Sequence, residues 1–211
     1  MSNRTMQAIQ ITTHGGPEVL HLAEAPIPQP GEGQVLIRVR AAGVNPADWK
    51  YRSGAMQRAT PLPLPWTPGL EGAGTVEALG PGVSQFQIGQ AVFGTFQAAY
   101  AQYALAHALD LQLKPEQVSF EAAATIPVGA LTAWGAVVDK ANVQPGQRVL
   151  VQGAAGGVGL FAVQLACWKG ARVYGTASSD NQEFVRSLGA EAIDYTARPF
   201  EDQVHDVDVV I

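Results

Sequence analysis

The sequence has 211 residues and a net charge of −5, and charged residues make up only 15% of it. This mild acidity predicts no nucleic-acid partner, which would need a basic surface. No apolar run approaches the roughly 20 residues that cross a bilayer, so no membrane insertion is expected. The single cysteine, Cys167, excludes an internal disulfide and a cysteine-rich zinc site. With no apolar stretch typical of a signal peptide near residue 1, a soluble cytoplasmic protein of one or two domains is expected.

The first half of the chain has the pattern of short strands separated by turns. Alternating apolar residues predict a strand at 34–39, and further strands are expected at 72–79, 91–93 and 99–105. Residues 26–34 contain three prolines and two glycines, which exclude regular structure there. This pattern predicts a small β-rich domain.

The pattern changes near Ser119, which is a suitable N-cap for an alanine-rich helix at 120–125. Glu121 falls in the first turn, where the helix dipole favours an anion. Pro127 interrupts this helix, and a second helix is expected at 130–138.

Strands and helices alternate from residue 148 onward. We expect strands at 148–152, 171–176, 190–194 and 206–211, with helices at 158–169 and 181–188. Such alternation predicts a parallel sheet covered on both faces. Because a doubly wound dinucleotide fold classically has six strands, the four strands predict a chain that continues beyond Ile211. A genuinely short protein is the alternative.

A glycine-rich segment joins the first of these strands to the first helix. Gly156 and Gly159 match the last two glycines of G-x-G-x-x-G, whereas Ala154 stands at the first. Small residues let the backbone approach a pyrophosphate, and the helix N-terminus supplies donors. The predicted cofactor-binding residues here are Ala155, Gly156, Gly157 and Val158. The alternative is a turn that only lets helix and strand pack closely.

The end of the next strand bears on the choice of cofactor. NAD sites usually have Asp or Glu about 20 residues after the glycine motif, where this chain has Thr176, Ser178 and Ser179. With no carboxylate to repel a 2′-phosphate, these hydroxyls predict NADPH. Helix capping is an alternative role for the serines, and Asp180 keeps NAD open.

Six segments in the same order resemble the medium-chain dehydrogenase/reductase superfamily, specifically its zinc-independent quinone oxidoreductase (zeta-crystallin-like) branch. They are HGGPEVL (14–20), AAGVNPADWKYRSG (41–54), PGLEGAGTVEALGPGV (68–83), AAATIPVGALTAW (122–134), PGQRVLVQGAAGGVG (145–159) and LGAEAIDY (188–195). The resemblance implies an α/β chain with a GroES-like β-rich catalytic domain at 1–127. It implies the first half of a Rossmann-type parallel α/β domain, here truncated, at 128–211. It also implies a homodimer for the complete protein.

The resemblance implies no metal site. Zinc-containing relatives have a cysteine after the Gly-Val of the first loop and a histidine in Gly-His-Glu, where this chain has Asn45 and Leu70. The ligands of a tetrahedral zinc site are therefore missing. The four histidines are scattered and are expected at the surface or in packing.

Four residues of the first domain are implied to act in catalysis. Asn45 would lie near nicotinamide and substrate, and Asp48 would hold its loop; turn and helix-cap chemistry is the alternative for both. Lys50 stands where relatives often have a tyrosine, with Tyr51 one position later. Either side chain is a candidate donor to a substrate carbonyl.

Two residues of the second domain match cofactor-contacting positions of the family. Thr132 would approach the nicotinamide amide, or else bond to its own helix backbone. Tyr195 would line the adenine-phosphate side, or else belong to the core. Trp49, Trp66 and Trp134 are candidate walls of an apolar pocket, and Cys167 is expected to be inert.

The implied activity is hydride transfer from NADPH to a quinone or an α,β-unsaturated carbonyl, without zinc. This chemistry needs only a positioned hydride donor and a hydrogen-bond donor at the oxygen. The alternatives are a non-catalytic NADPH-binding or structural relative, and an enoyl-reductase-type unit of a larger synthase.

Overall fold

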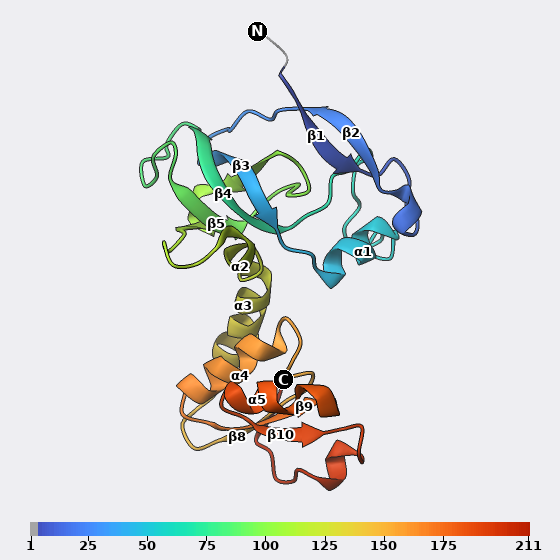
Figure 1. Cartoon of the computed structure of the whole chain (residues 1–211), viewed down its shortest axis with the longest axis vertical. Helices are drawn as coiled ribbons and strands as arrows, with labels where there is room; N and C mark the ends of the chain where they lie inside the picture. The colour runs from blue at the N-terminus through green and yellow to red at the C-terminus, as the bar shows by residue number, and fades with distance from the viewer. Residues whose placement is uncertain (1–3) are drawn as a thin grey trace. The chain divides into compact units, whose positions relative to one another are not determined.

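The computed structural model describes residues 4–211, and its contacts divide the chain into two compact units after Val128 (Figure 1). Each unit has its own sheet and its own buried core. None of the helices in the described part of the chain is long and apolar enough to cross a membrane.

The first unit is built on a five-stranded antiparallel sheet in the order β6-β3-β4-β5-β7. Apolar residues from alternate positions of these strands, such as Val35 and Ile37, are completely buried. A separate hairpin pairs β1 with β2. The strands are β1 (Thr5–Gln10), β2 (His21–Pro26), β3 (Gln34–Ala42), β4 (Glu71–Leu79), β5 (Ala91–Thr95), β6 (Tyr103–His107) and β7 (Leu111–Leu113).

The strand expected at 99–105 lies further toward the C-terminus in the structure, where β6 spans Tyr103–His107. The backbone before it serves other partners: the amide of Tyr100 donates to the Pro68 carbonyl over 3.0 Å, and that of Gln102 to the Gln7 carbonyl over 3.0 Å. Alternation of apolar residues alone did not distinguish these local bonds from a continuous ladder.

The helices of the first unit are short. Ser119 caps α2 as predicted, since its Oγ accepts a hydrogen bond from the Ala122 amide over 3.1 Å. Pro127 begins the next helix, because proline is tolerated in a first turn, where its missing N–H is not needed. The helix expected at 130–138 is therefore longer: α3 continues into the π-type helix η3. The helices up to residue 140 are η1 (Pro17–Val19), α1 (Pro46–Arg52), η2 (Ala108–Asp110), α2 (Phe120–Ala124), α3 (Pro127–Trp134) and η3 (Gly135–Lys140). The division between the units falls within α3, after Val128, so η3 belongs to the second unit.

The second unit contains a four-stranded parallel sheet in the order β10-β9-β8-β11. In chain order these are the third, second, first and fourth strands, which is the order of a classical dinucleotide fold up to that point. The predicted parallel sheet is confirmed. The elements are β8 (Arg148–Val151), α4 (Gly159–Trp168), β9 (Arg172–Ala177), η4 (Ser179–Asn181), α5 (Gln182–Ser187), β10 (Glu191–Asp194), η5 (Phe200–Asp202) and β11 (Val209–Val210).

Both faces of this sheet are covered. Val149, Val151 and Val173 point into a core that includes residues of α4 and α5. Leu150 and Tyr174, from the intervening positions, pack in a second core with Val204. The strand expected at 206–211 is reduced to Val209–Val210, because Asp206 has a φ of 55° and the Asp208 carboxylate accepts the Arg148 amide over 2.7 Å.

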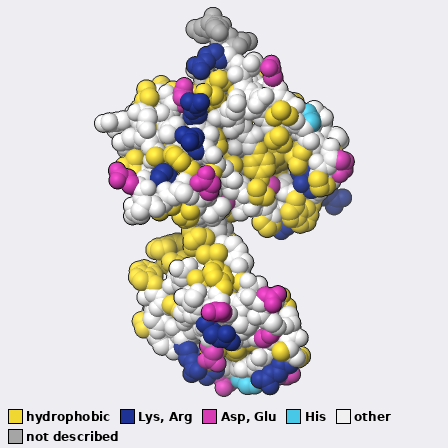
Figure 2. All heavy atoms as spheres, viewed as in Figure 1, with side chains coloured by type: hydrophobic (Ala, Val, Ile, Leu, Met, Phe, Trp, Pro, Cys, Tyr) yellow, Lys and Arg dark blue, Asp and Glu magenta, His cyan; other side chains and the backbone are white. Residues whose placement is uncertain are grey.

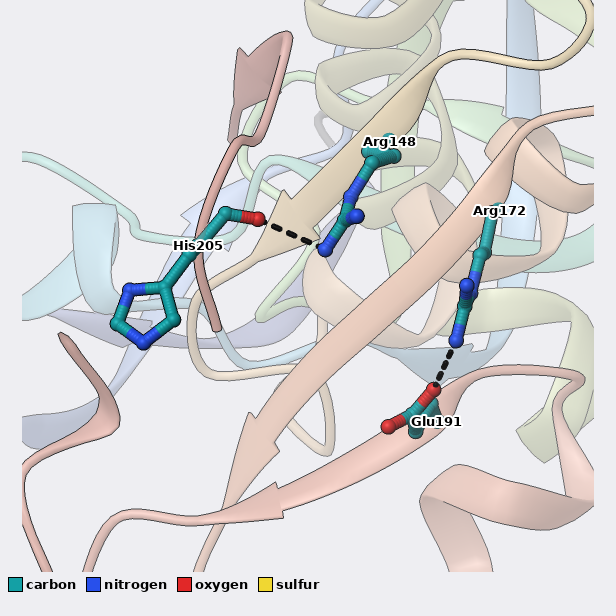
Figure 3. Close-up of polar contacts among 4 residues, drawn as sticks. All are labelled: Arg148, Arg172, Glu191 and His205. Atoms are coloured by element: carbon teal, nitrogen blue, oxygen red, sulfur yellow. Dashed lines mark hydrogen bonds and ion pairs between the residues drawn. The ribbon is translucent and has the colours of Figure 1, made fainter. Parts of the chain in front are cut away.

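Charged groups fix the amino ends of the parallel strands (Figure 3). Arg172, at the start of β9, pairs with Glu191, at the start of β10, over 3.1 Å. Arg148, at the start of β8, donates to the His205 carbonyl over 2.7 Å. These contacts lie at the opposite ends of the strands from the glycine-rich segment.

Large apolar side chains remain exposed on each unit, as Figure 2 shows for one face. Trp49 belongs to the first unit, and Trp134 and Trp168 belong to the second. The rings of Trp134 and Trp168 lie 6.1 Å apart, and Trp66 pairs with Tyr51 at 5.9 Å. Three of the four tryptophans thus have an aromatic neighbour.

Candidate functional site

Asp48 lies at the centre of a polar network in the first unit. Its carboxylate is almost fully buried and accepts three hydrogen bonds: from the Asn45 amide over 2.8 Å, the Gly69 amide over 3.1 Å and the Tyr100 hydroxyl over 3.0 Å. The bond from Asn45 is a helix-cap interaction at the start of α1. The helix-cap alternative raised by the sequence is therefore confirmed, and Asp48 also fixes the segment around Gly69.

Tyr100 is the partner that the sequence did not reveal. Burial of the ring, followed by the neighbouring charge and hydrogen bond of Asp48, raises the pKa of the Tyr100 phenol well above its usual value. The phenol therefore remains a proton donor to Asp48 throughout the physiological range.

Glu71 connects Asn45 to the start of α3. The residue is 2% exposed, and both carboxylate oxygens accept hydrogen bonds. Oε1 accepts from Asn45 Nδ2 over 2.7 Å, and Oε2 accepts from the Val128 amide over 2.7 Å. Asn45 is thus held through both its backbone and its side chain.

Two glycines make room for this network. A Cβ at Gly43 would lie 2.2 Å from Glu71 Oε1, so any side chain there would displace the carboxylate. Gly69 has a φ of 101°, and a Cβ there would lie 2.7 Å from the Tyr100 ring. The sequence motifs around both glycines therefore have a steric explanation.

Lys50 and Tyr51 lie on α1, and each has a tryptophan ring as a neighbour. Lys50 Nζ is 5.9 Å from the centre of the Trp49 ring, and Tyr51 packs against Trp66. Within residues 4–211, no hydrogen bond or ion pair joins either side chain to Asn45 or Asp48. The structure thus brings together two of the four predicted catalytic residues.

The glycine-rich segment of the second unit is anchored to the end of β9. The Gly153 amide donates to Thr176 Oγ1 over 3.0 Å, and the Ala154 amide donates to the Thr176 carbonyl over 2.9 Å. The Gly156 amide closes a turn onto the Gly153 carbonyl over 2.8 Å. The predicted cofactor residue Thr176 is buried and acts as the anchor of the loop.

The same segment fits a bound pyrophosphate. In the described part of the chain, the amides of Ala155, Gly157 and Val158 donate to no protein acceptor. A Cβ at Gly159 would lie 2.2 Å from the Gly153 carbonyl oxygen, whereas one at Gly157 would meet only open space. The segment precedes the ten-residue helix α4, whose dipole favours an anion.

Helix α3 lies against this segment. A Cβ at Gly129 would lie 2.4 Å from the Gly157 carbonyl oxygen, so the helix backbone approaches the loop closely there. Thr132 follows three residues later on the same side of the helix. This placement brings the predicted cofactor residue Thr132 to the neighbourhood of the loop.

The two serines that follow β9 have different surroundings. Ser178 Oγ accepts from Asn181 Nδ2 over 3.0 Å, in a local turn. Ser179 Oγ donates to Asp194 Oδ2 over 2.6 Å. The expectation that no carboxylate lies at this position was wrong, because the register of β9 and β10 brings Asp194 to it.

Tyr195 follows Asp194 directly, and the residue is 52% exposed. It is therefore not a core residue, which was the alternative to cofactor contact. Cys167 is half-buried: burial raises the pKa of its thiol, which donates weakly to the Gly189 carbonyl over 3.5 Å. A raised pKa disfavours the reactive thiolate.

In residues 4–211, no three His, Cys, Asp or Glu side chains gather closely enough to hold a metal ion. At the positions of the zinc ligands in relatives, Asn45 is bonded to Glu71 and Leu70 is apolar.

Comparisons with known proteins agree with this architecture. Residues 31–132 match the family model of the alcohol dehydrogenase GroES-like domain. Human quinone oxidoreductase is 42% identical over 194 residues, which cover 90% of this chain and 58% of that protein. The chain thus spans less than two thirds of that relative.

Solved structures show the same likeness. The quinone oxidoreductase of Coxiella burnetii has a TM-score of 0.89 and 38% identity, covering 99% of this chain and 68% of that one. A mycobacterial protein solved in complex with NADPH has a TM-score of 0.81 and 38% identity, covering 90% of this chain and 58% of that one. This chain belongs to the medium-chain dehydrogenase/reductase superfamily, in its quinone oxidoreductase branch. The expected fold class, a GroES-like part followed by a Rossmann-type parallel part, is confirmed.

Proposed function

We propose that the protein is an NADPH-dependent oxidoreductase that transfers hydride to a quinone or an α,β-unsaturated carbonyl without zinc. The observation that carries this proposal is the glycine-rich segment. Three of its amides are unused by the protein, and it is held by Thr176 at the carboxyl end of the parallel sheet. That is where dinucleotides bind in doubly wound folds. The family supports a nicotinamide cofactor.

The residues of the second unit would bind the cofactor. The amides of Ala155, Gly157 and Val158 would hold the pyrophosphate, and Ser178 has a hydroxyl proton to offer near the adenosine ribose. The bound dinucleotide supplies the hydride. NADPH is our proposed form, supported by the NADPH complex of the mycobacterial relative.

The residues of the first unit would orient the acceptor. Glu71 holds the Asn45 side chain through Nδ2, and the capping box at the start of α1 holds it further. Lys50 is exposed, and we propose that its Nζ donates to the carbonyl oxygen of the acceptor. Such a donor stabilises the charge that develops as hydride arrives. Homodimeric assembly of the complete protein and a cytoplasmic location are proposed on the resemblance alone.

The test combines binding with turnover. Calorimetric titration with NADPH is expected to show one site per chain, and Gly159→Ala is expected to abolish it because the new Cβ strikes the Gly153 carbonyl. Gly135→Ala is the matched control, since a Cβ there meets nothing within 4 Å. Oxidation of NADPH by a small quinone and by an enone is then measured with and without a chelator.

Chelator-insensitive turnover by the wild type supports the proposal. Binding without turnover by the full-length protein would instead identify a non-catalytic dinucleotide-binding relative. Equal binding by the wild type and Gly159→Ala would contradict the proposed cofactor site.

A further inference from the structure

A compact hydrogen-bonded cluster lies at the carboxyl ends of β9 and β10. Asp194 accepts from Ser179 Oγ at Oδ2 over 2.6 Å, and from Thr196 Oγ1 at Oδ1 over 2.6 Å. The Thr196 amide also donates to Oδ1 over 2.8 Å. These contacts, first the Ser179 hydroxyl and then that of Thr196, lower the pKa of Asp194 to about 2. The carboxylate is therefore charged at neutral pH.

The cluster lies where an adenosine ribose would reach. Thr176 anchors the glycine-rich segment, and Ser179 follows it by three residues. Asp194 is directly opposite Ala177 in the parallel register. In a dinucleotide fold whose pyrophosphate rests on the glycine-rich segment, the ribose 2′-position faces the end of the second strand, which here is β9.

The hydroxyl protons of this cluster are already used. A hydroxyl has one proton, and those of Ser179 and Thr196 both go to Asp194. The side chains of the cluster therefore present oxygen acceptors and a negative charge. A ribose 2′-hydroxyl can donate to such a surface, whereas a 2′-phosphate can only accept and carries like charge.

Within residues 4–211, Asp194 forms no ion pair with a Lys, Arg or His side chain. Within residues 4–211 the ion pair of the structure is Arg172 with Glu191, at the other end of β10 (Figure 3). Asp180, adjacent to Ser179 in the chain, is a further carboxylate near the same position. Electrostatics at the end of β9 thus disfavour an added phosphate.

We propose that Asp194 is a specificity-determining residue that limits the preference for NADPH and keeps NADH competitive as a cofactor. This inference rests on the proposed function, since it concerns the ribose end of the same dinucleotide site. Dinucleotide folds usually have the acidic residue that contacts the ribose at the end of the second strand. In this chain the proposed residue, Asp194, is at the end of the third strand.

The test measures dinucleotide affinity by calorimetry, so it needs no turnover. Asp194→Asn keeps a side chain of the same shape and removes the charge. It is expected to tighten binding of NADPH and of adenosine 2′,5′-bisphosphate roughly tenfold, while NADH changes little. Glu191→Gln is the matched control on the same strand, and Asp180→Asn tests the neighbouring carboxylate; neither is expected to shift the NADPH-to-NADH affinity ratio as far.

A measurement on the wild-type protein tests the inference even where a variant does not fold. Salt screens the repulsion between Asp194 and a 2′-phosphate. We therefore expect the affinity of adenosine 2′,5′-bisphosphate relative to that of 5′-AMP to rise with salt concentration. A ratio that falls with salt would overturn the inference, as would equal NADPH-to-NADH ratios for wild type and Asp194→Asn, or a larger shift from Asp180→Asn. Failure of wild type to bind either dinucleotide would overturn the proposed function itself.

Discussion

The side-chain amide of Asn45 donates to the buried carboxylate of Glu71 over 2.7 Å, although 26 positions separate the two residues in the chain. This bond fixes a residue that we propose to orient the acceptor. Glu71 also accepts a hydrogen bond from the Val128 amide, so both oxygens of the carboxylate that holds Asn45 have a partner.

Replacing Glu71 by Gln is expected to destabilise the first unit. Both Glu71 oxygens face N–H donors, so the amide nitrogen of a glutamine would face one of them. The variant loses one buried hydrogen bond and places two N–H donors against each other, which lowers the free energy of unfolding by about 1–3 kcal/mol. Urea unfolding measures the loss. Glu77→Gln on the same strand is the control, and an equal effect of both variants would contradict the assignment.

Adding a methyl group at Gly43 is expected to displace Glu71 and, through it, Asn45. The new Cβ would lie 2.2 Å from Oε1, and the strain costs about 1–3 kcal/mol. Thermal unfolding of Gly43→Ala against Gly135→Ala tests this. A Gly43→Ala protein as stable as Gly135→Ala would show that the carboxylate can move.

Tyr100 is expected to resist ionisation in the folded protein. A tyrosine in the unfolded chain titrates near a pKa of about 10, and the folded state raises that of Tyr100. At a pH between the pKa of the unfolded chain and the higher pKa of the folded state, folded Tyr100 keeps a proton that the unfolded chain releases. The free energy of unfolding therefore falls as the pH rises above about 10. Tyr100→Phe should weaken this fall, and should cost about 1 kcal/mol near neutral pH.

Ultraviolet titration of tyrosinate provides the direct measurement. The sequence has five tyrosines, and Tyr100→Phe should leave the native absorbance change near pH 10–11 unaltered. A reduced change in that variant would show that the phenol ionises normally.

Asp194 is expected to contribute to acid sensitivity with the opposite sign. Its pKa of about 2 in the folded state lies below the value of about 3.9 in an unfolded chain. The stabilisation is therefore complete above about pH 4 and is lost as the pH falls through about 2. The stability difference between wild type and Asp194→Asn should shrink between pH 5 and pH 2.5, and a difference independent of pH would contradict the hydrogen-bonded carboxylate.

Local patterns predicted those features that depend on near neighbours in the chain. The glycine-rich segment, the Ser119 cap and the parallel strands follow from spacing and residue type. The contacts of Asp48 with Tyr100 and of Ser179 with Asp194 join residues 52 and 15 positions apart. They depend on strand register and loop packing, which no single segment specifies. Asn45 and Asp48 of this network were predicted, and the Gly-Leu-Glu sequence of Glu71 next to a predicted strand was a further signal.

The placement of the tryptophans has a practical consequence. Trp49 and Trp66 belong to the first unit, and the neighbouring pair Trp134 and Trp168 belongs to the second. Indole emission from each unit can therefore be isolated by replacing the other two tryptophans with phenylalanine. Such a pair of proteins would show whether the two halves of the chain melt together or in sequence, without any attached dye.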